Sequence, residues 1–370
     1  MKDQSQAQQQ MDILSSVMIR RWLPAKTRER AIFDGVLAGL NHLEDIDSAG
    51  KANFLQLANT HHVTVRALAV LERAAWEHGY DACGEWCASS LSAERGRIHQ
   101  ALEMLQCICG VLESEQCPVA VIKSLDHWPD LGSDLDLYTT ADAGRVDEIM
   151  RTRFGATAIE RSWGDRLAGK WNFQVPGLPE LVEIHVRYLG QTGEHEAMAR
   201  RIIERRILTS VDDRDFYVPA PEERILISTL QRVYRHFYFR LCDMVEMAAL
   251  LNTHTVDFDE LLKAADIGGI RPGVATFLSQ IQSYIESYGG TVTIPPYVVA
   301  SAYSRGMRVR FENGFLRIPK LPAAALYGAQ LVRAGLRSDM RALCRLPLLP
   351  PLAVSALVVY HLAGDDKGIW

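Results

Sequence analysis

The chain has few cysteines, no excess of positive charge and no apolar stretch typical of a secretion signal at its start. Its seven cysteines form no C-x-x-C pair, which predicts reduced, mostly buried thiols. A zinc site built from Cys83, Cys87, Cys107 and Cys109 is the alternative. The formal net charge of -5 excludes a protein that is basic throughout, so any basic surface must be local.

Long apolar runs are also missing. The start, MKDQSQAQQQ, lacks the apolar stretch of a secretion signal, so we expect a cytoplasmic protein. The most apolar segment, residues 346–364, contains three prolines and is short for a spanning helix, so we expect no transmembrane helix.

The remaining pattern predicts an α+β fold, in which a small mixed sheet is flanked by helical lobes. We divide the 370 residues into a helical N-terminal lobe (1–115), an α/β core (116–192), a helical region packing on that core (193–288) and a basic and apolar C-terminal region (289–370). Within the core, strands are expected at PVAVIKS, DLDLYTT, ATAIERSW, GKWNFQV and ELVEIHVRYL, with a helix at ADAGRVDEIMRTRF.

Three local expectations concern the helical regions. Ser90 and Ser92 are predicted to cap a helix that follows them. One long helix is expected over residues 221–251, on which His236, Arg240 and Asp243 would share a stripe and form a structural ion pair under the site. The adjacent His61 and His62 would point in different directions on a helix, which argues against a metal role for them.

The chemistry is concentrated in KSLDHWPDLGSDLDLYTT, residues 123–140. On a strand, Asp134 and Asp136 project from the same face while Leu135 and Leu137 enter the core. Two adjacent carboxylates repel unless a cation lies between them, and oxygen ligands without Cys or His favour Mg²⁺ or Mn²⁺. Glu183, on the polar face of a later strand, would supply a third acid. The alternative is that the two aspartates form a solvated strand edge.

This arrangement resembles the polymerase-beta-like nucleotidyltransferase superfamily, in which a Gly-Ser pair precedes Asp-x-Asp on the next strand and a third acid follows. Nine residues separate Ser124 from Asp134, as in that superfamily, although Lys123-Ser124 stands where Gly-Ser is usual. The lysine, together with VEIHVRY at residues 182–188, is similar to a bacterial branch of uncharacterised nucleotidyltransferases.

The resemblance implies transfer of a nucleoside monophosphate from an NTP, ATP above all, to a hydroxyl or phosphate of a small molecule, peptide or protein. It implies that Asp134, Asp136 and Glu183 are the catalytic residues and hold two metal ions. The candidate nucleotide contacts are Lys123, Ser124, Ser133, Lys170 and Arg187, with Arg161 as a further clamp. His185 would hold Glu183 or contact the acceptor, or be purely structural.

Two alternatives to this function remain open: a toxin-like nucleotidyltransferase acting on tRNA or on a protein, and an inactive nucleotide-binding or scaffold protein. A second basic feature bears on the partner. Arginines recur every four residues from Arg333 to Arg345 (with Arg337 and Arg341 between), after Arg305, Arg308, Arg310, Arg317 and Lys320. This ladder is either a solvated helix face or a peripheral contact with an anionic surface.

Overall fold

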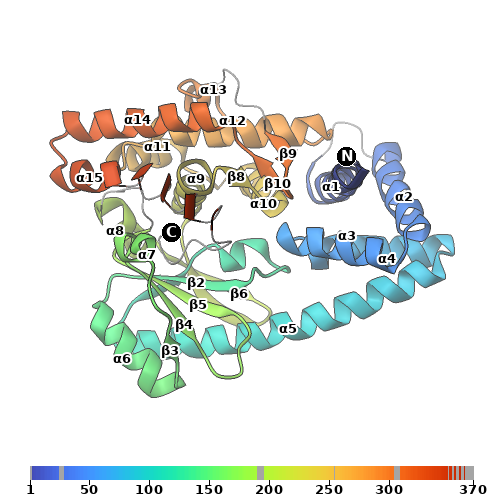
Figure 1. Ribbon diagram of the computed structural model, residues 1–370, viewed down its shortest axis with the longest axis horizontal. Coiled ribbons are helices and arrows are strands. Elements are labelled where there is room, and N and C mark those ends of the chain that lie inside the picture. Colours follow the sequence, from blue (N-terminus) through green and yellow to red (C-terminus); the bar gives the residue numbers. More distant parts are fainter. Residues whose placement is uncertain are drawn as a thin grey trace.

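The structure is a computed structural model that describes residues 2–24, 29–189, 196–253, 255–303 and 309–348, with scattered positions between 350 and 362. Helices dominate the N-terminal part (Figure 1). They are α1 (Lys2–Trp22), α2 (Glu29–Asp45), α3 (Ser48–Thr60), α4 (Thr64–His78) and α5 (Asp81–Ser114). The 34 residues of α5 extend about 50 Å along the bottom of Figure 1, from the other N-terminal helices to the sheet.

A small mixed sheet follows, so the predicted α+β fold is confirmed. Its elements are β1 (Val119–Val121), η1 (Ser124–His127), β2 (Asp134–Thr139), α6 (Ala143–Phe154), β3 (Thr157–Ala158), α7 (Trp163–Ala168), β4 (Lys170–Gln174) and β5 (Leu181–Val186). The strand order is β1-β2-β5-β4-β3. Only β2 and β5 run parallel to each other, and the other neighbours are antiparallel.

Helices return after the sheet and cover its upper side in Figure 1. They include α8 (Glu196–Glu204), α9 (Pro221–Thr229), a π-helical segment η2 (Leu230–His236), α10 (Leu241–Asn252), α11 (Phe258–Ile267) and α12 (Arg271–Ser287). Short strands β6 (Ile207–Val211) and β7 (Arg214–Val218) form a hairpin. The last elements are α13 (Pro296–Val299), β9 (Arg310–Glu312), β10 (Phe315–Arg317), α14 (Lys320–Leu336), α15 (Met340–Arg345) and η3 (Leu346–Leu348).

Both faces of the sheet are buried. Val182, Ile184 and Val186 of β5 enter the main core, as their alternation predicts. On the other face, Tyr138 of β2 packs in a second cluster with Ile202 of α8. The face of β5 that carries Glu183, which the sequence predicts to be polar, is therefore covered by helices rather than exposed to water.

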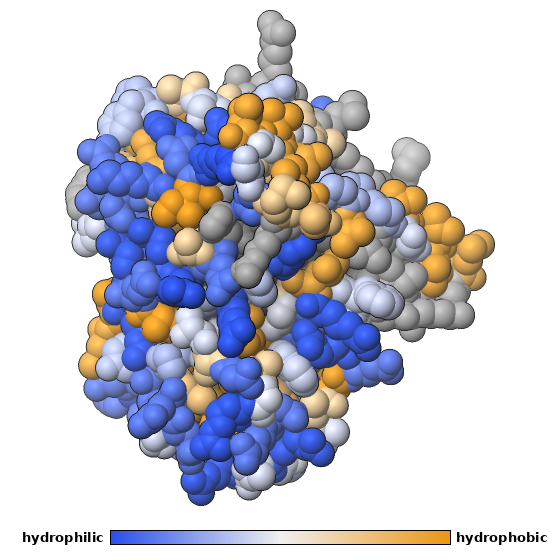
Figure 2. All heavy atoms as spheres, turned by 90° about the vertical axis from the view of Figure 1, so that its left-hand side faces the viewer, coloured by the Kyte–Doolittle hydropathy of each residue, from blue (hydrophilic) through white to orange (hydrophobic). Residues whose placement is uncertain are grey.

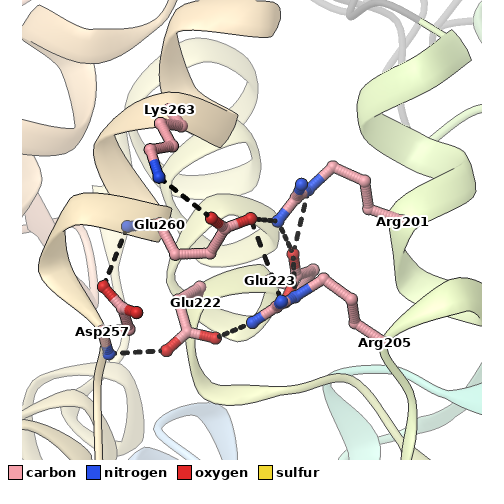
Figure 3. A network of polar contacts seen from close by, with 7 residues as sticks. All are labelled: Arg201, Arg205, Glu222, Glu223, Asp257, Glu260 and Lys263. Atoms are coloured by element: carbon pink, nitrogen blue, oxygen red, sulfur yellow. Dashed lines mark hydrogen bonds and ion pairs between the residues drawn. The ribbon is translucent and has the colours of Figure 1, made fainter.

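Helix α8 is fixed in place by a network of charged side chains (Figure 3). Arg201 donates to Glu223 at 2.7 Å and to Glu260 at 2.8 Å, and Arg205 donates to Glu222 at 2.8 Å. These acids come from α9 and α11, and Glu223 is only 1% exposed. The network joins three helices and holds α8 over the sheet.

Two helix predictions are wrong. Ser90 and Ser92 do not cap the start of a helix, because both residues lie within α5. The long helix over residues 221–251 is interrupted: α9 passes into η2, Phe237 adopts φ 57, and β8 (Tyr238–Phe239) precedes α10. A turn at Glu312-Asn313-Gly314 joins β9 to β10, and the segment TVTIPPYVV before these strands contains α13.

The predicted state of the cysteines is borne out, since all seven are free and Cys83, Cys87, Cys117 and Cys242 are buried. The alternative zinc site is excluded. Its four cysteines lie on the single helix α5, where the roughly 20 residues between Cys87 and Cys107 span about 30 Å.

Candidate active site

Three acidic side chains meet where β2 and β5 run side by side. Asp136 and Glu183 are direct partners in the parallel register. Asp134 shares the face of Asp136 because side chains two apart on a strand project together. His185, on the same face as Glu183, donates from Nε2 to Glu183 Oε1 at 2.7 Å. The structure thus brings together the three acids singled out in the sequence.

Two lysine ammonium groups lie against these acids. Lys123 Nζ contacts Asp136 Oδ1 and lies 3.6 Å from Glu183 Oε1. Lys170, from β4, places its Nζ 2.8 Å from Glu183 Oε2 and 3.2 Å from Asp165 Oδ1. The carboxylates are therefore neutralised by side chains of the protein itself.

The acids differ in their affinity for protons. Burial raises the pKa of Asp136 to about 7, and the charge of Glu183 adds to this effect. Burial also raises the pKa of Asp134. For Glu183 burial acts in the same direction, but Lys123, the hydrogen bond from His185 and Lys170 hold its pKa well below the usual range. Burial lowers the pKa of His185 to about 4, so the imidazole is neutral near pH 7.

The turn before η1 delivers Lys123 to this cluster. Lys123 adopts φ 63 and ψ -54, and Ser124 N donates to Ile122 O at 2.6 Å, which defines a γ-turn with positive φ. The Ser124 hydroxyl accepts from Asp136 N at 2.8 Å and donates to Asp134 O at 3.2 Å. It therefore joins η1 to β2, and its proton is already donated within the protein.

The acids line a pocket of about 190 Å³ whose wall also carries a basic group of side chains. This group, Arg232, Arg235, His236 and Arg240, comes from η2 and the residues just after it. The Nε atoms of Arg235 and Arg240 are buried and have no hydrogen-bond partner among the described residues. Buried guanidinium donors are normally paired, and phosphate oxygens are strong acceptors for them.

A comparison with protein families matches residues 47–286 to the family described as "Uncharacterised nucleotidyltransferase". The chain belongs to this family. All of the pocket residues lie within the matched segment.

Among solved structures, the chain is similar to the crystal structure of an antigenic nucleotidyltransferase-like protein from Paracoccidioides brasiliensis. The identity is 13% and the TM-score 0.31, over 54% of this chain and 95% of that one. A comparison with curated proteins found no match.

The interruption of the predicted long helix explains why the arginines of this nucleotidyltransferase-family chain face the pocket. The π-helical segment and Phe237 redirect the backbone between Arg235 and Arg240. The predicted stripe of His236, Arg240 and Asp243 is therefore wrong. Asp243 instead lies 2.7 Å from Arg232 Nε and accepts from Arg240 backbone N at 2.6 Å, while His236 and Arg240 line the pocket.

Sequence reasoning missed Arg232 and Arg235. Their only signal is the spacing of basic residues in RVYRHFYFR, residues 232–240. Lys123, Ser124, Ser133 and Lys170, which it did select, line the pocket.

Two selected arginines lie elsewhere. Arg187 follows β5 with φ 67, and its half-exposed side chain lies 3.9 Å from Asp142. Arg161 stacks on Trp171 with 4.4 Å between the guanidinium carbon and the ring centroid. Neither lines the pocket in the part of the chain that the structure describes.

Helix α5 braces both acidic strands through one residue. Arg97 donates to Leu131 O at 3.0 Å and Gly132 O at 3.4 Å, in the loop before Asp134. It also pairs with Glu180, which directly precedes β5 and is 2% exposed. The entry of β2 and that of β5 are thereby held by the same guanidinium group.

The C-terminal arginine ladder does not form one helix face. Arg333 lies in α14, which ends at Leu336, and Arg345 lies in α15. Arg337 donates to Ile267 O at 3.2 Å, and Arg345 donates to Leu167 O and stacks 4.3 Å from the Tyr188 ring centroid. Arg305 and Arg308 lie outside the described residues. Binding to an anionic surface stays a prediction.

Figure 2 shows the left-hand face of Figure 1, where hydrophilic side chains cover most of the surface and hydrophobic ones gather in its upper half. Exposed hydrophobic residues of the C-terminal helices include Val332, Leu336 and Met340. No helix among the described residues is long and apolar enough to cross a membrane.

Proposed function

We propose that this chain is a metal-dependent nucleotidyltransferase. It would transfer a nucleoside monophosphate from an NTP, with ATP as the expected donor, to a hydroxyl or phosphate of a small molecule, peptide or protein. The observation that carries the proposal is the direct register of Asp136 with Glu183 on parallel strands, beside Asp134, in a pocket that also holds Arg235 and Arg240.

The donor set fits Mg²⁺ or Mn²⁺. Carboxylate oxygens are the ligands that hard divalent cations prefer. Ligand atoms of Asp136, Glu183 and His185 lie within 4.8 Å of one another. The ammonium group of Lys123 already lies against two of these carboxylates, which indicates that the position favours a cation. When bound, the metal would act as a Lewis acid and lower the pKa of the acceptor hydroxyl.

The remaining roles belong to side chains of the chain itself. Arg235 and Arg240 would bind phosphate oxygens, because each has a buried Nε without a partner among the described residues. His185 would orient Glu183 through their 2.7 Å hydrogen bond. The ammonium group of Lys123, which lies against Asp136 and Glu183, would bind a phosphate oxygen of the nucleotide.

Calorimetric titration with each of the four NTPs, with and without Mg²⁺, tests this proposal. We expect binding that requires Mg²⁺ and that disappears in the Asp134→Asn/Asp136→Asn double variant. The matched control is Asp147→Asn/Glu148→Gln, which removes two charges from α6, away from the pocket. NTP binding that is unchanged in the Asp134/Asp136 variant would contradict the proposal.

One observation favours a second candidate, a nucleotide-binding or scaffold protein without catalysis. The ammonium group of Lys123 contacts Asp136 and could exclude a divalent cation permanently. NTP binding that is the same with and without Mg²⁺, together with no release of pyrophosphate, would favour this candidate.

A further inference from the structure

Three potential ligands for a transition metal meet beside the acidic pocket. His62 comes from the turn between α3 and α4, His127 is the last residue of η1, and Cys242 is the second residue of α10. One ligand atom of each lies within 4.8 Å of the other two. The three residues belong to separate stretches of the chain, and only the fold brings them together.

Their spacing agrees with zinc coordination. A tetrahedral zinc ion has bonds of about 2.1 Å to nitrogen and about 2.3 Å to sulfur, which places those two ligand atoms about 3.6 Å apart. Cys242 Sγ lies 3.7 Å from His127 Nε2. The rings of His62 and His127 lie edge to face, with 5.4 Å between their centroids.

Contacts of the backbone hold this arrangement independently of any metal. His61 accepts two hydrogen bonds from the start of α10: Leu241 N donates to its Nδ1 at 2.9 Å, and Cys242 N donates to its carbonyl oxygen at 3.2 Å. On the other side, a Cβ on Gly132 would lie 2.9 Å from His62 Cε1, so the glycine lets the ring approach closely. The ligands are therefore positioned in advance.

Both imidazoles have a ring nitrogen that is open to a metal. Each ring has a buried Nδ1 without a hydrogen-bond partner among the described residues. Burial raises the pKa of the Cys242 thiol, and a zinc ion would displace the thiol proton to solvent as the Zn–S bond forms.

Nearby positive charge is partly compensated. Three of the surrounding arginines have acidic partners: Arg66 pairs with Asp130 and Glu246, Arg224 with Asp126, and Arg232 with Asp243. The fourth, Arg240, has no ion pair with an acid among the described residues. These pairs reduce the repulsion that a dication would otherwise meet. The thiolate of Cys242 would neutralise half of the metal charge.

We infer that His62, His127 and Cys242 form a zinc site. A borderline-soft ion with nitrogen and sulfur ligands suits this donor set, whereas Mg²⁺ prefers oxygen. His62 and His127 also line the pocket. The site goes beyond the proposed function, because it uses none of the three carboxylates, and it joins the N-terminal helices, the α/β core and α10.

Cobalt substitution of the full chain tests this site. After removal of metal with a chelator, Co²⁺ titration should produce a thiolate-to-cobalt charge-transfer band that saturates as a single site, and added zinc should abolish this band. Zinc should also raise the Tm of the wild-type protein. Cys242→Ser should abolish the band, and His62→Gln should weaken cobalt binding by more than about tenfold.

Two controls separate this site from other sources of binding. Cys117→Ser removes another buried cysteine and should keep the band. The Asp134→Asn/Asp136→Asn variant should also keep the charge-transfer band. The test of the zinc site is therefore independent of the test of the proposed function. A wild-type protein without the band, or a band that persists in Cys242→Ser, would overturn the inference. If circular dichroism shows that Cys242→Ser does not fold, the His62→Gln variant decides instead, and an undiminished cobalt affinity of His62→Gln would overturn the inference.

Discussion

Replacing Lys123 with glycine and, separately, with alanine measures the strain in the turn that enters the active site. Lys123 has φ 63 and ψ -54, in a γ-turn closed by the 2.6 Å hydrogen bond from Ser124 N to Ile122 O. A residue with a Cβ in so sparsely populated a conformation costs about 1–3 kcal/mol. Glycine adopts positive φ without that steric cost.

The comparison isolates the backbone because both variants lose the same ammonium group. The lost contacts to Asp136 and Glu183 cancel in the difference between them. Glycine loses about 0.5–1 kcal/mol more conformational free energy on folding than alanine. We therefore expect the free energy of unfolding of Lys123→Gly to exceed that of Lys123→Ala by about 1 kcal/mol, the difference between the middles of these two ranges.

Urea denaturation followed by tryptophan fluorescence measures this difference. The matched control is Thr152 on the exposed side of α6, where the glycine variant should be less stable than the alanine variant by about 1 kcal/mol. An alanine variant at position 123 as stable as the glycine variant would refute the strain argument. Mg²⁺ should also raise the Tm of both Lys123 variants more than that of the wild type, because a competing cation has been removed from the carboxylates.

Three further predictions concern other parts of the chain. Asp130→Ala breaks a buried ion pair with Arg66 and should lower the free energy of unfolding by about 3 kcal/mol. This is the lower end of the range for a broken buried pair, because Arg66 still pairs with Glu246. Arg151→Ala, which breaks an exposed ion pair, should change the free energy of unfolding by less than about 1 kcal/mol. Equal effects in urea denaturation would contradict this burial argument. Arg235→Ala should remove about 1.5–3 kcal/mol of NTP binding, a loss of about 10- to 150-fold in calorimetry, and unchanged affinity would exclude a phosphate contact. Gly314→Ala, at φ 77 in the turn between β9 and β10, should lower the Tm, and no change would show that the turn does not contribute to stability.

The acidic strands were predictable because their signal is local. Alternation with a period of two assigns Asp134 and Asp136 to one face, and the same rule places Glu183 opposite Val182 and Ile184. The resemblance then favoured the pairing of these strands. Their register, Asp136 beside Glu183, is what the structure adds.

The helix that was predicted over residues 221–251 shows why other features were not predictable. Apolar residues at three- and four-residue steps continue through the π-helical segment, so the pattern carries no mark of the break at Phe237. The break follows from packing: Asp243 pairs with Arg232 and accepts from Arg240 N, which stabilises a new helix start at Leu241. Local periodicity cannot report such a contact.

The sequence by itself determined the α+β class, the other core strands and the three acids, since each depends on spacing within a few residues. The strand predicted at ATAIERSW is wrong beyond Thr157–Ala158, because Trp163 begins α7. Tertiary structure alone decided which cations surround those acids and which histidines meet Cys242. Lys123 reaches Asp136 through a turn, Arg235 enters the pocket after a break, and His62 meets His127 across two segments of the chain. These contacts join residues far apart along the chain, and only the packing of helices on the sheet specifies their distances.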